Sequence, residues 1–469
     1  MVQLAYMAAA LLFVFGIKQL SKVKTARQGN RMAAGAMLLA IAATMILLWG
    51  HVALWIILAG VAVGSVAGFL LATRTPMTAM PELVAVFNGM GGAASMFVAL
   101  SEVSTFTSIF TKHSLNEVAA RGGSSFAVAI VLSILIGGVT LSGSLIAYAK
   151  LAGKIWKSRL GPFGDIKINI LLAAIALIVL IWCGFGAMGN TVVVAAFVLT
   201  LVALLLGIGL VVAIGGADMP VVISLLNSYS GLAASATGFV LQNELLVIAG
   251  SLVGAAGLIL TNIMCKAMNR SLSNVLFGGF GGDEGGAKED TGYNNVKSTS
   301  AEEVAPLLDV ARKVIVVPGY GMAVAQAQHK VRELGDLLEQ RGCEVSYAIH
   351  PVAGRMPGHM NVLLAEADVP YDKLYDLDQI NSEFKNTDIA IVIGANDVCN
   401  PAASDPTSAI AGMPVLDVWD AQTVIVIKRS LSAGYAGIKN ELFEMDNSLM
   451  LFADGKAAVE DMVNELKEL

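Results

Sequence analysis

A glycine-rich turn at residues 318–324 carries a spacing that suits nucleotide chemistry. It reads Pro-Gly-Tyr-Gly-Met-Ala-Val, which places Gly319, Gly321 and Val324 in the order G-x-G-x-x-V. A short apolar strand precedes the turn and a helix is expected to follow it, as in dinucleotide-binding turns. In that setting the two glycines allow a tight turn and let the backbone approach a pyrophosphate at the helix N-terminus. The pattern therefore predicts a nucleotide site.

The end of the next predicted strand lacks the acid that would favour NAD(H). That strand ends at His350, with Glu344 at its opposite end, whereas NAD sites place Asp or Glu there to hold the ribose 2′-hydroxyl. A 2′-phosphate needs cations instead, and Lys428, Arg429 and Ser430 follow the last predicted strand. Two cations and a hydroxyl can grip a phosphate through charge-assisted hydrogen bonds. The alternative is a solvated basic pair.

Two further loops follow predicted strands, where ligands of open α/β sheets bind. Their residues are Val352, Ala353, Gly354, Arg355, Met356 and Pro357 in one loop, and Gly394, Ala395, Asn396 and Asp397 in the other. Each could equally be a simple glycine-rich turn. No metal site is predicted, because the spacing of His350 and His359 across a turn does not suit a shared ion.

The composition divides the chain into two classes of solvent environment. Hydrophobic residues make up 56% and charged residues 14% of the 469 positions, against about 45–50% and about 25% in soluble proteins. Long apolar runs stop near residue 266, and the remainder resembles a soluble domain. The net charge of −6 and the lack of a long basic tract argue against nucleic acid as a partner. The four cysteines form no CxxC pair, so neither a disulfide framework nor a zinc site is expected.

About 20 apolar residues suffice to cross a bilayer, and nine windows of this kind are present. They are 3–20, 32–50, 52–73, 82–103, 125–149, 168–187, 191–215, 219–241 and 244–266. Lysine and arginine gather in the loops after the first and fifth windows, at residues 18–31 and 150–167. The positive-inside rule then puts these loops and the C-terminal domain in the cytoplasm, or in a mitochondrial matrix, with the N-terminus outside.

The rest of the chain is predicted to be a linker and an α/β domain. Residues 1–276 form the transmembrane domain, the glycine-rich stretch 277–300 a flexible linker and residues 301–469 the nucleotide-binding domain. Strands are expected at 313–317, 344–349, 389–393, 415–418 and 424–427, alternating with helices. Such alternation predicts a Rossmann-like, doubly wound parallel sheet.

Several long segments resemble one known family. Residues 319–328 (GYGMAVAQAQ), 350–361 (HPVAGRMPGHMN), 394–397 (GAND), 428–430 (KRS) and 434–437 (GYAG) are similar to the third domain of proton-translocating nicotinamide nucleotide transhydrogenases. Residues 215–220 (GGADMP) and 226–231 (LNSYSG) resemble the membrane region of the same family. The resemblance covers nearly the whole chain and implies the membrane-embedded beta subunit. Its activity would be hydride transfer between NADH and NADP⁺, coupled to proton movement.

The resemblance also implies which residues hold NADP(H), and that it lies across the sheet in an inverted sense. Tyr320 and Arg355 would contact the nucleotide, with Arg355 at the pyrophosphate, and Asp397 would lie near the nicotinamide half. Lys428, Arg429 and Ser430 would hold the 2′-phosphate. A lid through Gly434 and Tyr435 would cover the cofactor, and Gly412, Met413, Asp454 and Gly455 would complete the pocket.

No side chain need act as a catalyst, since hydride would pass directly between two nicotinamides. The chain shows one dinucleotide pattern, so NAD(H) would bind to a partner subunit. The resemblance implies that this partner is an alpha subunit, in a dimer of alpha–beta units. A separate subunit of this length favours a bacterial inner membrane. The competing hypotheses are a secondary transporter with a regulatory nucleotide domain and a nucleotide-gated channel.

Polar residues within the apolar windows predict a proton pathway, because such residues are rare in lipid and usually functional. The candidates are Asn88, Asp218, Asn227, Ser228 and Tyr229. Glu82 and Asp218 could instead lie at the membrane interface, and the hydroxyls of the fifth window, at residues 140–144, are expected to join helices. Asn88 stands where many relatives have a histidine. Asparagine does not titrate, so another group, such as a histidine of a partner subunit, must carry the proton.

Overall fold

The structure, a computed structural model, describes most of the chain. The described residues are 2–20, 23–49, 54–112, 123–154, 164–185, 190–215, 218–277, 292–356, 358–408, 410–434 and 436–469. The chain divides into two compact units, one of Met1–Asn262 with Ser273–Gly282 and one of Ile263–Leu272 with Asp283–Leu469. Pro357, Tyr435 and part of the predicted linker, 278–291, lie outside the described residues.

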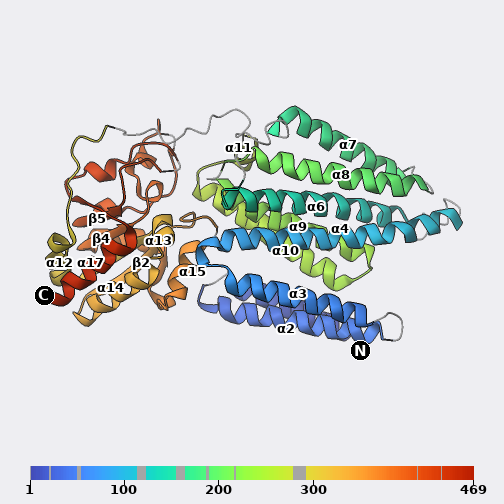
Figure 1. The fold of residues 1–469 in the computed structure, drawn as a ribbon, viewed down its shortest axis with the longest axis horizontal. Coiled ribbons are helices and arrows are strands. Elements are labelled where there is room, and N and C mark those ends of the chain that lie inside the picture. Colours follow the sequence, from blue (N-terminus) through green and yellow to red (C-terminus); the bar gives the residue numbers. More distant parts are fainter. Residues whose placement is uncertain are drawn as a thin grey trace. The chain divides into compact units, whose positions relative to one another are not determined.

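The first unit consists of apolar helices (Figure 1). They are α1 (Val2–Leu20), α2 (Val23–Leu47), α3 (Leu54–Arg74), α4 (Met80–Lys112), α6 (Gly123–Leu151), α7 (Ile166–Phe185), α8 (Asn190–Val212), α9 (Met219–Val240) and α10 (Glu244–Ala267). Within the described ranges, eight of these are long and apolar enough to cross a membrane, and the apolar stretch of α7, Ile166–Trp182, is shorter. Each predicted window therefore falls on a helix. The prediction of a multi-span helical domain is confirmed.

Small residues let the membrane helices approach closely. A methyl group at Gly92 of α4 would lie 2.7 Å from the carbonyl oxygen of Gly137 on α6, and one at Gly137 would lie 2.6 Å from that of Gly92. Both distances are shorter than any real carbon contact, so the two backbones touch only because these positions are glycine. Helix α6 packs in turn against α8 and α9. The two contacting glycines thus set the distance between α4 and α6.

The second unit holds a six-stranded parallel sheet in the order β3-β2-β1-β4-β5-β6. Its strands are β1 (Lys313–Pro318), β2 (Glu344–Ile349), β3 (Leu374–Asp376), β4 (Ile389–Ile393), β5 (Thr423–Lys428) and β6 (Ser448–Phe452). Every pair is parallel. This is the strand order of a dinucleotide-binding fold, with the switch point between β1 and β4. The predicted doubly wound sheet is confirmed.

Both faces of the sheet are covered, which explains why its strands are continuous apolar runs. Three helices pack together on one face, α12 (Ala301–Val310), α14 (Gln328–Gln340) and α17 (Gly455–Glu468) (Figure 1). On the other face, alternate strand residues such as Ile315 and Val317 join a core that includes Phe384 and Phe443. The remaining helices of this unit are α13 (Tyr320–Ala325), α15 (His359–Glu366), α16 (Leu377–Ile380) and several short 3-10 turns, while nearly all of α11 (Leu272–Phe277) belongs to the first unit.

One strand prediction is wrong and two strands were missed. Residues 415–418 belong to no strand, because loops and side chains take the hydrogen bonds of Val415 and Leu416, and Val418 begins a 3-10 turn. Leu416 N donates to Val398 O at 2.9 Å, and Asn381 Nδ2 donates to Val415 O at 2.9 Å. The missed strands are β3 and β6. Lys428 therefore ends the fifth strand and not the last.

Residues 292–299 precede α12, and the last three of them run beside strand β6. Met450 N donates to Lys297 O at 2.7 Å, and Thr299 N donates to Met450 O at 2.9 Å. Ser300 then caps α12, where its hydroxyl accepts a hydrogen bond from Glu303 N. This part of the predicted linker thus packs against the sheet domain; we call residues 292–299 the strap.

Candidate functional site

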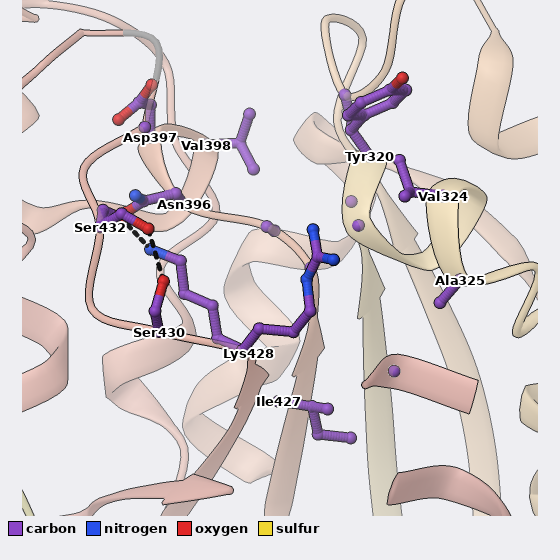
Figure 2. Close-up of a pocket in the computed structure, with 18 of the residues that line it drawn as sticks. Tyr320, Val324, Ala325, Asn396, Asp397, Val398, Ile427, Lys428, Ser430 and Ser432 are labelled. Carbon is purple, nitrogen blue, oxygen red and sulfur yellow. Dashed lines mark hydrogen bonds between the residues drawn. The ribbon is translucent and has the colours of Figure 1, made fainter. Parts of the chain in front are cut away.

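A pocket of about 410 Å³ lies at the switch point of the sheet, where β1 and β4 end (Figure 2). Most of the predicted site residues line it: Gly319, Tyr320, Gly321, Val324, Val352, Ala353, Gly354, Gly394, Ala395, Asn396, Asp397, Lys428, Arg429, Ser430, Gly434, Asp454 and Gly455. They come from five separate loops that each follow a strand. Figure 2 shows Tyr320 and Val324 on one side, with Asn396, Asp397 and Lys428 on the other.

The glycines of the G-x-G-x-x-V turn are needed for contact between two loops. Gly319 N donates to Ile393 O and Gly321 N donates to Gly394 O, each at 2.9 Å. A methyl group at Gly321 would lie 2.5 Å from the Cα of Gly394, which itself adopts a φ of +63°. The sequence assigned these glycines to close approach of a pyrophosphate. In the structure their N–H groups are bonded to the neighbouring loop, so the motif shapes the pocket by holding the two loops together.

Lys428 lies inside the wall of the pocket and is not a solvated cation. Its Nζ donates to Ser432 O at 2.5 Å and lies 4.9 Å from the centre of the Phe443 ring. The Asn396 amide oxygen, when turned toward it, accepts from the same Nζ at 3.0 Å. Burial lowers the pKa of Lys428 to about 8, partly offset by the nearby Asp397 carboxylate. The ammonium group can thus both hold the loop and face an anion in the pocket.

Arg429 and Ser430 line the same pocket but are exposed. The Ser430 hydroxyl lies 2.6 Å from that of Ser432, which places two hydroxyl groups beside the arginine (Figure 2). The alternative of a simple solvated pair therefore fails for Lys428, whereas Arg429 keeps its donors accessible. A guanidinium and two hydroxyls form a donor set that suits a phosphate group.

Asp397 is covered by the loop that follows Ser432. Its Oδ2 accepts a hydrogen bond from Ala436 N at 3.0 Å. A side chain at Gly434 would collide with the Asp397 carboxylate, so only glycine fits there. The neighbouring Cys399 thiol is fully buried, and burial together with Asp397 raises its pKa to about 12. The carboxylate thus fastens the loop whose residues Ser432, Ala433 and Gly434 line the pocket.

Tyr320 and Arg355 lie together at the opposite side. The Arg355 guanidinium carbon is 4.5 Å from the centre of the Tyr320 ring, within cation–π range. Arg355 N donates to His359 Nδ1 at 3.1 Å, and burial lowers the pKa of His359 to about 4. Gly354, with a φ of +106°, leaves no room for a side chain against His359. A neutral histidine thus shapes the loop that carries Arg355.

The end of β2 carries a neutral histidine where NAD sites have an acid. His350 is buried, and burial lowers its pKa to about 4. Its Nδ1 accepts from Val352 N at 3.2 Å, so the proton is on Nε2, which donates to Pro414 O at 2.8 Å. Glu344 is exposed at the other end of the strand. The acid that would select a ribose hydroxyl is thus absent from this strand end.

Some predicted residues do not line the pocket. Arg355, Met356, Gly412 and Met413 lie outside its lining, and Met413 belongs to the apolar core. Sequence reasoning missed the lining residues Ala325, Val398, Ile427, Ser432, Ala433 and Ala453. Each lies within two positions of a predicted residue, so adjacency to the motifs was the available signal. In the described part of the chain, no cluster of histidine, cysteine or acidic residues could hold a metal ion.

Comparison with known proteins agrees with this geometry. Residues 2–465 match the family model described as NAD(P) transhydrogenase beta subunit. Two curated proteins named NAD(P) transhydrogenase subunit beta, both from Rhodospirillum rubrum, are each 48% identical over 472 residues, covering 98% of both chains. The chain belongs to the NAD(P) transhydrogenase beta subunit family. This family implies nicotinamide nucleotide binding and, with the apolar helices, indicates an integral membrane protein.

The transhydrogenase membrane unit places the predicted pathway residues on several helices. Asn88 of α4 is buried and its Nδ2 donates to Ser144 Oγ of α6 at 3.2 Å. Asp218 is buried at the N-terminal end of α9, and Ser228 Oγ donates to Gly254 O of α10 at 2.6 Å. Asn227, by contrast, is exposed on α9. The candidates thus lie on α4, at the N-terminal end of α9 and along α9.

Tyr229 and the hydroxyl side chains of α6 make further contacts in this unit. Tyr229 is half-buried and packs against the small core of Val139, Ala203 and Leu206. Of the hydroxyls expected to join helices, Ser144 accepts a hydrogen bond from α4, whereas Thr140 and Ser142 donate to carbonyls of their own helix. Ser133, which the sequence did not single out, joins α6 to α9 through Thr237 at 2.6 Å.

Proposed function

We propose that this chain binds NADP(H) in the switch-point pocket and couples its hydride exchange with NADH to proton movement. Two features together carry the proposal. Arg429 and Ser430 follow β5 in the pocket, and β2 is followed by a neutral His350 instead of an acid. A 2′-phosphate needs hydrogen-bond donors such as those of Arg429 and Ser430, and it does not need an acid at the end of β2.

The hydrogen bonds of the glycine turn support an inverted orientation of the nucleotide. In an ordinary dinucleotide fold the pyrophosphate meets free N–H groups at this turn. Here Gly319 N and Gly321 N already bond to Ile393 and Gly394 carbonyls. The pyrophosphate would then lie nearer Arg355 and Tyr320, while Asp397 would face the nicotinamide half under the loop through Gly434. Tyr435 would complete this lid.

Arg429→Ala tests the phosphate site. Removing the guanidinium from a charge-assisted pair costs about 1.5–3 kcal/mol, so affinity for NADP⁺ should fall about tenfold or more while that for NAD⁺ stays unchanged. Equilibrium binding of both nucleotides would be measured. Arg312→Ala, at the opposite end of β1, controls for the change in net charge. Unchanged discrimination would remove Arg429 from the site.

The chemistry requires a partner subunit. Hydride passes directly between nicotinamides, so the chain supplies placement and exclusion of water, and an alpha subunit would bring NAD(H). Exposed Asn227 in the middle of an apolar helix supports a protein neighbour, because a polar group facing lipid is unfavourable. Reduction of NADP⁺ by NADH in the assembled complex separates this proposal from a nucleotide-regulated transporter, which would give none.

Proton flow would give the reaction its direction. One charge crossing about 100 mV releases ~2.3 kcal/mol. At ~1.4 kcal/mol per decade, this shifts the equilibrium constant of hydride exchange roughly fortyfold. This needs protonation to change the affinities for NADP⁺ and NADPH unequally. Asp218, buried at the N-terminal end of α9, is our candidate relay. In vesicles, Asp218→Asn should leave hydride exchange intact and abolish its response to a proton gradient; a normal response would exclude this relay.

We further propose that the complex is a dimer of alpha–beta units in a bacterial inner membrane. The basic loops at 18–31 and 150–167 support a cytoplasmic C-terminal domain and a periplasmic N-terminus. Proteolysis of sealed vesicles of known orientation would test this arrangement.

A further inference from the structure

The strap, residues 292–299, is fastened to the segment 439–446. Asn440 N donates to the Tyr293 hydroxyl oxygen at 2.9 Å. The Tyr293 ring centre lies 5.9 Å from that of Phe443, and Lys439 Nζ lies 5.0 Å from the Tyr293 ring. Tyr293 therefore touches three neighbours at one end of the strap.

Other strap residues hold the same segment through backbone and charge. Glu444 Oε1 accepts from Asn294 N at 2.6 Å and from Asn295 N at 3.2 Å. Glu444 also pairs with Lys439, and these bonds lower its pKa. Further along, Lys297 Nζ pairs with Asp446 Oδ1 at 3.1 Å. The strap is thus attached to this segment at Tyr293, at Asn294 with Asn295, and at Lys297.

The inner side of the segment 439–446 reaches the nucleotide pocket. Asn440 is fully buried, and its Nδ2 donates to Asn396 O at 3.1 Å. The Asn396 amide oxygen, turned toward Lys428, accepts from Lys428 Nζ at 3.0 Å and from Gly434 N at 2.7 Å. Phe443 offers its ring to the same ammonium group at 4.9 Å. Asn396, Lys428 and Gly434 all line the pocket.

We propose that Tyr293 is a positioning residue for the nucleotide site. Its hydroxyl and ring fix Asn440 and Phe443, and these in turn fix Lys428 and the loop through Gly434. The strap forms the last part of the predicted linker, residues 277–300, and precedes α12 in the sequence. The inference rests on the proposed function and assigns to Tyr293 an effect on NADP(H) affinity.

The test compares Tyr293→Phe with Lys297→Ala in the full chain assembled with its alpha partner. Tyr293→Phe removes one hydrogen bond and keeps both ring contacts. Loss of a bond worth about 1 kcal/mol corresponds to about a fivefold rise in Kd at ~1.4 kcal/mol per decade. We expect this rise in the Kd and KM for NADP⁺ with little change in kcat, and faster hydrogen exchange at residues 430–434. Lys297→Ala, which releases the strap elsewhere, should leave all four unchanged.

The outcomes separate the inference from its foundation. Wild-type affinity in Tyr293→Phe, with the unaltered complex binding NADP⁺, would overturn the positioning role. An equal rise in Kd in both variants, in proportion to their loss of Tm, would also overturn it, because the strap would then act only on stability. Failure of the unaltered complex to bind NADP⁺ would instead refute the proposed function, and the inference would fall with it.

Discussion

The sheet domain and the membrane unit both use glycine to bring backbones together, but under different restraints. In the sheet domain, Gly394 adopts a φ of +63° and lies against Gly321, so it satisfies two conditions at once. In the membrane unit, Gly92 and Gly137 have no positive φ and meet only because neither has a side chain. The loop contact therefore requires glycine both for its backbone conformation and for the close approach, whereas the helix contact requires it only for the close approach.

The two regions also differ in how they arrange polar side chains. The sheet domain gathers them in one pocket at the carboxyl ends of its strands. The membrane unit pairs them singly between helices, as in Asn88 with Ser144 and Ser133 with Thr237. Water can hydrate an open pocket, whereas lipid offers no partner to a polar group. The candidate site is thus a pocket in the sheet domain, whereas in the membrane unit an exposed polar side chain such as Asn227 stands apart from the paired ones.

The largest effect should come from Gly394→Ala. The new methyl group would collide with Gly321 and force a positive φ on alanine, so the free energy of unfolding should fall by about 2–5 kcal/mol. Nucleotide binding should be lost with it. Thermal unfolding and NADP⁺ titration of the purified chain would measure both. Gly342→Ala shares the positive φ, at +87°, but meets nothing within 4 Å, and should cost only about 1 kcal/mol. Equal losses in the two variants would contradict the role of the loop contact.

Gly92→Ala should have a smaller effect, because helices can separate slightly where interlocked loops cannot. Overpacking against Gly137 should cost about 1–3 kcal/mol, measured by thermal unfolding in detergent. In Gly64→Ala the methyl group meets nothing within 4 Å, so stability should stay level or rise with the better helix propensity of alanine. A loss in Gly64→Ala as large as that in Gly92→Ala would show that helix spacing does not depend on the glycine contact.

Titration of Lys428 tests whether the pocket depends on one buried charge. Its pKa of about 8 means that the ammonium form dominates below that pH and the neutral form above it. A phosphate prefers the ammonium form, so NADP⁺ affinity should fall as pH rises through about 8, by at most about tenfold per pH unit. Isothermal titration from pH 7 to 9.5 would show this fall. Lys428→Met should bind NADP⁺ more weakly, and its affinity should not fall as pH rises through about 8. A flat wild-type profile would exclude Lys428 from phosphate binding.

The smallest effect should come from separating Asn88 and Ser144. Hydrogen bonds between membrane helices contribute about 0.6 kcal/mol on average, so Asn88→Ala and Ser144→Ala should each lose about that much stability. The double variant should lose little more than either single one. A double-mutant cycle on thermal unfolding measures the coupling, and fully additive losses would mean that the bond seen between α4 and α6 contributes nothing.

Much of the site could be predicted because parallel strands place their carboxyl ends at one edge. Once the G-x-G-x-x-V turn was assigned to a strand end, the loops at 352–357 and 394–397 and the basic group at 428–430 were expected beside it, and the structure brings members of each into one pocket. The apolar windows likewise located the membrane helices, because length and composition alone decide whether a helix can cross lipid.

What could not be predicted depends on contacts between distant residues. Residues 415–418 were predicted to be a strand because three of the four are apolar, yet Asn381 and the loop at Val398 take the hydrogen bonds of Val415 and Leu416. Strand β3 has three residues, too few for a pattern. The contacts of Lys428 depend on Ser432, Asn396 and Phe443, which lie elsewhere in the chain or in a loop. In the membrane unit, only helix packing decides that Asn227 is exposed while Ser228 is buried.

The strap has a consequence for how the sheet domain behaves apart from the membrane. Strand β6 is an outer strand, and the strap occupies the N–H and C=O groups of Met450 that would otherwise face solvent. An unpaired strand edge is a template for pairing with another molecule. A soluble fragment beginning at Ala301 would open this edge and self-associate, whereas one beginning before Gly292 would keep it closed and stay monomeric.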